Sequence, residues 1–252
     1  MSIKDLTQKS FSVLIIRSFG VLLLFGFTLF ITNFFTPENV GRYDFVRSTI
    51  MVLGGLALMG TNQSIIYYSG LLKARKSVES IRIIYFKMLR IIFALSLIIL
   101  GLFVGIFNEA TILQIFKSEE SFSLILKSIL TLIFFSTTML NIDTMRALEK
   151  TILSEMYRSL FRYLPVFVFA IILLKTNRQS LLVEAYLLGF ILLSIFSFAR
   201  VFALLSKLET PRDDSEKFSV KEIFKTSAPM ALSAIAYFIM QSIDIIILSI
   251  YE

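Results

Sequence analysis

Long apolar stretches, separated by short polar connections, dominate the chain. Several of them approach or exceed the ~20 residues that an α-helix needs to cross ~30 Å of hydrocarbon. The predicted spans cover residues 11–35, 45–70, 83–107, 122–142, 160–175, 181–205 and 226–250. This pattern predicts an all-α polytopic membrane protein with about seven transmembrane helices.

Two of these spans contain a proline. Pro165 lies in the fifth span and Pro229 near the start of the seventh. Neighbouring helices can satisfy the carbonyls that a proline leaves unpaired, so both spans stand as predictions. In the second span, Gly54 and Gly55 allow either close helix packing or a bend, of which we expect packing.

The composition supports a membrane protein and excludes several chemistries. Of 252 residues, 56% are hydrophobic and 17% are charged, against about a quarter charged in soluble domains. The absence of cysteine excludes disulfides and thiolate nucleophiles, and the absence of histidine excludes Ser-His catalysis and histidine metal ligands. We therefore expect no enzymatic activity, no cofactor and no metal.

The formal net charge of +7 is distributed unevenly between the two predicted membrane faces. With a cytoplasmic N-terminus, eighteen lysines and arginines belong to the inner side, Arg158 and Arg162 among them, and six to the outer side. Inner loops of membrane proteins carry the excess of basic residues, so the count predicts an N-terminus in the cytoplasm. The same rule explains the positive charge without a nucleic-acid partner.

A long polar segment precedes the last span. Residues 207–225 include a proline, two adjacent aspartates and mixed charges, which predicts a surface linker. The linker ends in an amphipathic piece with Val220, Ile223 and Phe224, expected to lie at the membrane interface.

Three stretches together resemble a known transporter family. PENVGRY contains Gly41 and Tyr43 in the predicted outer loop 36–44, GTNQSIIYYSG closes the second span, and the segment 219–252 contains Pro229 and Asp244. In this order and spacing they resemble the polysaccharide/oligosaccharide flippases of the multidrug/oligosaccharidyl-lipid/polysaccharide exporter superfamily.

The resemblance implies an architecture. Members usually have twelve to fourteen helices in two six-helix lobes, so residues 1–206 are expected to form an N-terminal six-helix lobe. Residues 207–225 are then the cytoplasmic linker between lobes, and 226–252 the first helix of a C-terminal lobe. The final residue, Glu252, comes directly after the last apolar run, which leads us to expect that the chain is the N-terminal part of a longer protein.

The resemblance also implies a function. The substrate would be an oligosaccharide on a polyprenyl diphosphate, translocated across the bacterial inner membrane for surface-polysaccharide synthesis such as that of O-antigen. Membrane lipids and other polysaccharide-assembly proteins are the expected partners.

Arg17 is the most conspicuous candidate residue because it interrupts the first span. It either extends to the inner headgroups, lines a hydrated cavity, or pairs with an acid on another helix. The resemblance implies that Arg17 and Arg47, with Arg42 a weaker candidate, bind the substrate diphosphate. Arg47 is alternatively an interfacial partner of Asp44.

Four other candidate site residues are polar side chains within the predicted spans. Asn62 and Gln63 either form hydrogen bonds between helices or contact sugar hydroxyls. Gln241 and Asp244 lie one helical turn apart on one face of the last span. They are candidates for coupling to an ion gradient, with a structural ion pair as the alternative.

Three other functions remain open. A cation-coupled multidrug antiporter of the same superfamily would favour acidic and aromatic cavity residues over arginine. A membrane glycan polymerase or ligase usually needs a large outer loop, whereas the outer connections here are short. A seven-helix receptor would have its N-terminus outside, against the charge distribution.

Overall fold

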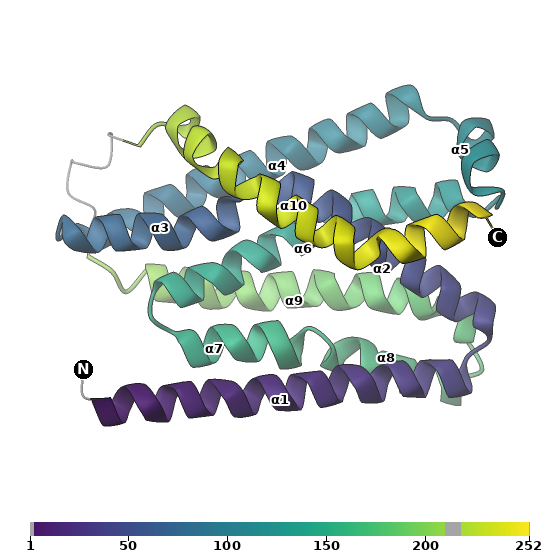
Figure 1. Cartoon of the computed structure of the whole chain (residues 1–252), viewed down its shortest axis with the longest axis horizontal. Helices are drawn as coiled ribbons and strands as arrows, with labels where there is room; N and C mark the ends of the chain where they lie inside the picture. Colours follow the sequence, from purple (N-terminus) through teal and green to yellow (C-terminus); the bar gives the residue numbers. More distant parts are fainter. Residues whose placement is uncertain (1–2, 210–217, 252) are drawn as a thin grey trace.

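A computed structural model of the chain describes residues 3–209 and 218–251, and within those ranges it contains helices and no strands (Figure 1). The long helices pack side by side, and short 3₁₀ or π-helical turns (η) join some of them. The elements are α1 (Ile3–Phe34), α2 (Pro37–Leu58), α3 (Thr61–Ala74), η1 (Val78–Ser80), α4 (Ile81–Ile106), α5 (Glu109–Phe116), α6 (Ser121–Ala147), α7 (Thr151–Met156), η2 (Tyr157–Phe161), α8 (Leu164–Lys175), η3 (Gln179–Leu181), α9 (Leu182–Leu205) and α10 (Val220–Tyr251).

The described residues include six helical segments that are long and apolar enough to cross a membrane, or seven if α2 and α3 form one bent span. The predicted all-α fold with about seven such helices is thereby confirmed at the level of helix number, length and composition. The segments are Thr7–Phe34, Val78–Ile106, Ser121–Ala147, Thr151–Lys175, Gln179–Leu205 and Val220–Ile250.

The second predicted span differs from the structure in two respects. The PENVGRY segment, predicted as a loop, is the start of α2: the Thr36 side chain accepts a hydrogen bond from the Asn39 N–H, and Pro37 occupies the first turn. The span is then broken by 41° between α2 and α3. Met59 and Gly60 both adopt positive φ there, which ends one helix and starts the next.

The fifth predicted span, 160–175, begins too late. The apolar segment starts at Thr151 and passes through the π-helical turn η2 before Pro165 opens α8. Arg158 and Arg162, which the charge count assigned to the inner connection, therefore lie within the span. The orientation stays a prediction from the distribution of basic residues in the sequence.

The connections contain more helix than the sequence suggested. The outer connection 108–121 forms α5, capped by the Asn108 side chain. Residues 220–225, predicted as the end of the linker, are the first turns of α10, with Ile223 buried. Of the predicted linker, residues 210–217 lie outside the described residues, as does Glu252.

Glycines and aromatic rings set how closely the helices pack. The Phe135 ring of α6 fills the space beside Gly54, and the Phe238 ring of α10 the space beside Gly55, so this pair serves packing, as expected. The bend occurs at Gly60 instead. Because Gly55 leaves room for the Phe238 ring, α10 lies along α2 (Figure 1).

Candidate functional site

Arg17 on α1 forms an ion pair with Glu155 on α7. The Arg17 Nε donates to Oε1 of Glu155 at 2.9 Å, and Nη2 donates to Oε2 at 3.1 Å. The Glu155 side chain is 7% exposed, whereas that of Arg17 is 57% exposed. Of the three interpretations of Arg17, the geometry corresponds to a pair with an acid on another helix. The pair still leaves more than half of the Arg17 side chain exposed.

A close approach between α1 and η2 positions this pair. A Cβ atom on Gly20 would lie only 2.5 Å from the Ser159 Cβ, so the absence of a side chain lets the two segments touch. Arg17 lies one turn before Gly20 and faces the same helical stretch, formed by α7 and η2. The Ser159 hydroxyl also donates to Oε1 of Glu155 at 2.7 Å, so this oxygen accepts from both Ser159 and Arg17.

A second ion pair lies next to the first. Asp143 of α6 accepts hydrogen bonds from Arg158 of η2 and, at 3.1 Å, from the Asn62 side-chain amide of α3. Arg158 follows Glu155 by three residues, about one turn along the continuous helical stretch of α7 and η2. The two pairs therefore form one polar chain, here called the charge chain, made of Arg17, Glu155, Arg158, Asp143 and Asn62.

The charge chain connects segments that are distant in sequence. It joins α1, α7, η2, α6 and α3, and the Ser154 hydroxyl ties α7 to α6 through the Ile142 carbonyl at 2.8 Å. A charge inside a membrane span is costly unless it is paired, and here each carboxylate has at least two donors. Asn62, a predicted sugar contact, forms an inter-helix hydrogen bond, and its side-chain oxygen is buried without a partner among the described residues.

Arg47 lies apart from the charge chain. It forms an ion pair with Asp44 at 3.2 Å and sits over the Tyr43 ring, 6.0 Å from its centroid. Its Nε is buried and has no hydrogen-bond partner among the described residues. The structure thus shows the contact with Asp44 that the sequence offered as the alternative, and does not bring Arg47 together with Arg17.

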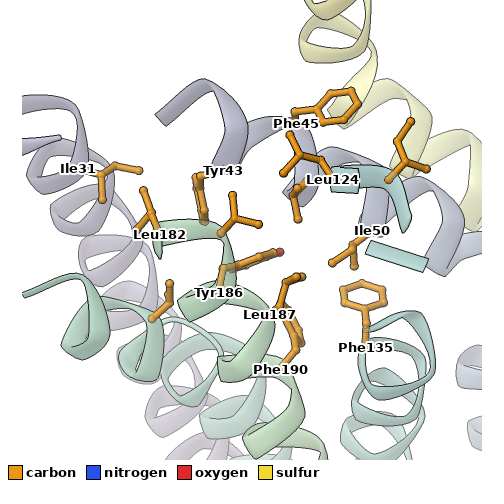
Figure 2. Close-up of a cluster of buried hydrophobic side chains, with 14 of the residues drawn as sticks. Ile31, Tyr43, Phe45, Ile50, Leu124, Phe135, Leu182, Tyr186, Leu187 and Phe190 are labelled. Carbon is orange, nitrogen blue, oxygen red and sulfur yellow. The ribbon is translucent and has the colours of Figure 1, made fainter. Parts of the chain in front are cut away.

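A third arginine, Arg162, is enclosed by aromatic rings. Its guanidinium carbon lies 5.9, 5.5 and 5.8 Å from the ring centroids of Phe135, Tyr163 and Phe190. Figure 2 shows Phe135 and Phe190 among the buried side chains around Tyr186. Cation–π contacts of this kind stabilise a half-buried guanidinium such as that of Arg162.

The remaining predicted site residues face away from these arginines. Gln63 is exposed on α3. Gln241 and Asp244 are exposed on α10, where the Gln241 amide donates to the Tyr237 hydroxyl at 2.7 Å. The described contacts of these three side chains include neither Arg17 nor Arg47.

The apolar pattern did not reveal Glu155 as the partner of Arg17. Glu155 and Arg158 lie in the stretch assigned to an inner connection, and Asp143 lies one residue after the predicted span 122–142. One signal was available: the predicted span 160–175 gives only ~24 Å of helix, short of the ~30 Å needed. Extending it to Thr151 would have placed Glu155 and Arg158 within the span.

Within the part of the chain that the structure describes, no three acidic side chains come close enough to hold a metal ion. Comparisons with protein-family models, with curated proteins and with solved structures gave no match.

Proposed function

We propose that this chain contributes to flipping a polyprenyl-diphosphate-linked oligosaccharide from the inner to the outer leaflet of the bacterial inner membrane. In this proposal the N-terminus is cytoplasmic, α1–α9 provide the N-terminal lobe, and α10 begins a second lobe. No bond is made or broken. The protein supplies a polar path, because moving sugars and phosphates through hydrocarbon is otherwise prohibitive.

The observation that supports the proposal is that Arg17 is both held by an ion pair and exposed. It lies ten residues, roughly 15 Å, inside its apolar segment, and its side chain is 57% exposed although a buried carboxylate holds it. A guanidinium binds phosphate oxygens through two parallel hydrogen bonds and stays charged at every physiological pH. Arg17 thus combines a fixed position with an accessible phosphate-binding group.

Glu155 gives this arginine a resting partner. Without substrate the carboxylate neutralises Arg17, which lowers the cost of holding a cation at this depth. A diphosphate carries more negative charge than one carboxylate and competes for the same N–H groups. Glu155 then keeps the Ser159 hydrogen bond and the nearby Arg158 charge. Arg47 is proposed as a second diphosphate contact, and Gln63 as a contact to sugar hydroxyls.

A binding measurement on the full chain in lipid nanodiscs tests this proposal. The ligand is a polyprenyl diphosphate, and the corresponding polyprenyl alcohol controls for the lipid tail. We expect Arg17→Gln/Glu155→Gln to bind the diphosphate roughly 10- to 100-fold more weakly than the wild type, from the ~1.5–3 kcal/mol of a charged hydrogen bond. This double variant removes the guanidinium without leaving Glu155 charged and unpaired.

Two single variants sharpen the result. Glu155→Gln keeps Arg17 and removes its competitor, so diphosphate affinity is expected to equal or exceed that of the wild type. Arg90→Gln removes an exposed arginine from α4 and should leave affinity unchanged. Equal diphosphate binding by wild type and the double variant would contradict the proposal.

The second candidate function is cation-coupled multidrug export, which the exposed face of α10 favours. Tyr237, Gln241 and Asp244 are all exposed there, and an accessible carboxylate beside an aromatic ring suits an organic cation. Drug resistance in cells separates the two functions. Export lost in Asp244→Asn and retained in Arg17→Gln/Glu155→Gln would favour the antiporter.

A further inference from the structure

A groove of about 700 Å³ lies at one end of the bundle, where three helices converge. The start of α1, the start of α7 and the end of α9 meet there, at the left of Figure 1. These are also the ends of three apolar segments: Thr7–Phe34, Thr151–Lys175 and Gln179–Leu205. If those segments cross a membrane, the groove opens at its interface.

Basic side chains from separate parts of the chain line this groove. They are Lys9 of α1, Lys150 of the turn before α7, Arg200 of α9 and Lys207 just after it, all exposed. The basic-loop rule explains why cations occur at this end, but it does not require four segments to place them around one hollow.

The one acidic residue in the groove is already neutralised. Glu149 accepts a hydrogen bond from Lys73 of α3 at 2.6 Å, and Lys73 does not line the groove. This contact and the neighbouring cations lower the pKa of Glu149 below its ordinary value, so the carboxylate stays ionised and paired. The groove therefore keeps a strong positive charge.

The interior of the groove is apolar. Its remaining lining includes Leu153 and Met156 of α7 and Leu204 of α9. Met156 lies five residues, roughly 7 Å, farther into the apolar segment than Thr151. Cations at the rim and aliphatic side chains below them match a molecule with an anionic head and a hydrocarbon tail.

We infer that this groove binds an anionic membrane phospholipid, with the phosphodiester between Lys150, Arg200 and Lys207 and an acyl chain along Leu153 and Met156. Basic pockets between transmembrane helices at the cytoplasmic side are typical sites for anionic headgroups. The inference requires only that the helices cross a membrane. It does not depend on the transported substrate.

Retention of phospholipid by the purified full chain tests this inference. The chain is equilibrated with mixed micelles of dioleoyl phosphatidylglycerol or dioleoyl phosphatidylcholine, and bound lipid is measured by native mass spectrometry. Phosphatidylglycerol is expected to bind the wild type in preference to phosphatidylcholine. Arg200→Gln/Lys207→Gln should weaken phosphatidylglycerol binding roughly 30-fold, because each basic side chain near an anionic surface contributes ~1 kcal/mol.

The matched control variant also removes two positive charges, but from residues outside the groove. Lys221 and Lys225 are exposed on the first turns of α10, outside the groove, so Lys221→Gln/Lys225→Gln should keep phosphatidylglycerol binding. Equal loss in both double variants, or no preference for the anionic lipid, overturns the inference. So does displacement of the lipid by millimolar glycerol 3-phosphate, which shows that the site recognises phosphate alone.

Discussion

The two members of the Arg17–Glu155 pair have opposite surroundings. Glu155 is nearly buried, whereas more than half of the Arg17 side chain is accessible. Removing either partner therefore has a different consequence. Loss of the arginine leaves a buried carboxylate without its ion-pair partner, and loss of the carboxylate leaves an arginine whose side chain is already more than half exposed.

We predict that Arg17→Gln destabilises the fold more than Glu155→Gln. The unpaired buried carboxylate should cost ~1–3 kcal/mol, whereas loss of a partner by the exposed arginine should cost below ~1 kcal/mol. The double variant Arg17→Gln/Glu155→Gln should recover part of the loss, because no buried charge remains. Thermal unfolding in detergent micelles measures all three. A larger loss in Glu155→Gln than in Arg17→Gln would contradict this description of the pair.

The Lys73–Glu149 pair, outside the apolar segments, predicts a pH effect. Lys73 lowers the pKa of Glu149 in the folded chain. The pair therefore stabilises the fold at pH values above 4.5, the ordinary pKa of a glutamate. That contribution is lost as the pH falls through the lowered pKa. Because both side chains are exposed, it should stay below ~1 kcal/mol. A carboxyl ¹³C NMR titration should show the Glu149 pKa rising in Lys73→Gln; an unchanged pKa argues against the pair.

At the scale of elements, the break between α2 and α3 depends on Gly60. Its φ of +73° is unfavourable for residues with a side chain, and an added Cβ would lie 2.3 Å from the Ser227 carbonyl oxygen of α10. Gly60 therefore forms the bend between α2 and α3 and also lets α10 pack closely against that bend.

Gly60→Ala is accordingly expected to destabilise the chain by more than ~1–2 kcal/mol, the cost of left-handed backbone alone. Gly70→Ala is the matched control, since nothing lies within 4 Å of the position its Cβ would occupy and alanine favours a helix. The difference in melting temperature between the two variants measures the effect. Similar melting temperatures would show that Gly60 does not require its backbone conformation.

Helices were predictable from the sequence where the apolar pattern alone determines them. The predicted spans 83–107 and 181–205 agree with α4 and α9 to within two residues, whereas α1 begins eight residues before its predicted span and α6 ends five residues after its own. The early start of the fifth span at Thr151 was signalled only by the short length of the predicted span, because Glu155 and Arg158 look like loop residues until their partners on α1 and α6 are known. The sequence singled out Arg17, but its partner depends on tertiary contacts.

At the scale of the whole molecule, the distribution of basic residues predicts which end of the bundle faces the cytoplasm. The chain contains no cysteine, so single cysteines can report orientation directly. Ser118 and Ser206 are exposed at opposite ends of the bundle. A membrane-impermeant maleimide should label Ser118→Cys in intact cells and Ser206→Cys only after the membrane is opened. The reverse labelling would contradict a cytoplasmic N-terminus.

The central claim, that Arg17 contacts a lipid diphosphate during translocation, is tested most directly by measuring flipping. The full chain is reconstituted in liposomes containing a fluorescent polyprenyl-diphosphate oligosaccharide, and the fraction accessible to an external quencher is followed with time. The account predicts that wild type and Glu155→Gln move the lipid between leaflets, whereas Arg17→Gln/Glu155→Gln does not. Equal flipping by wild type and the double variant would contradict it.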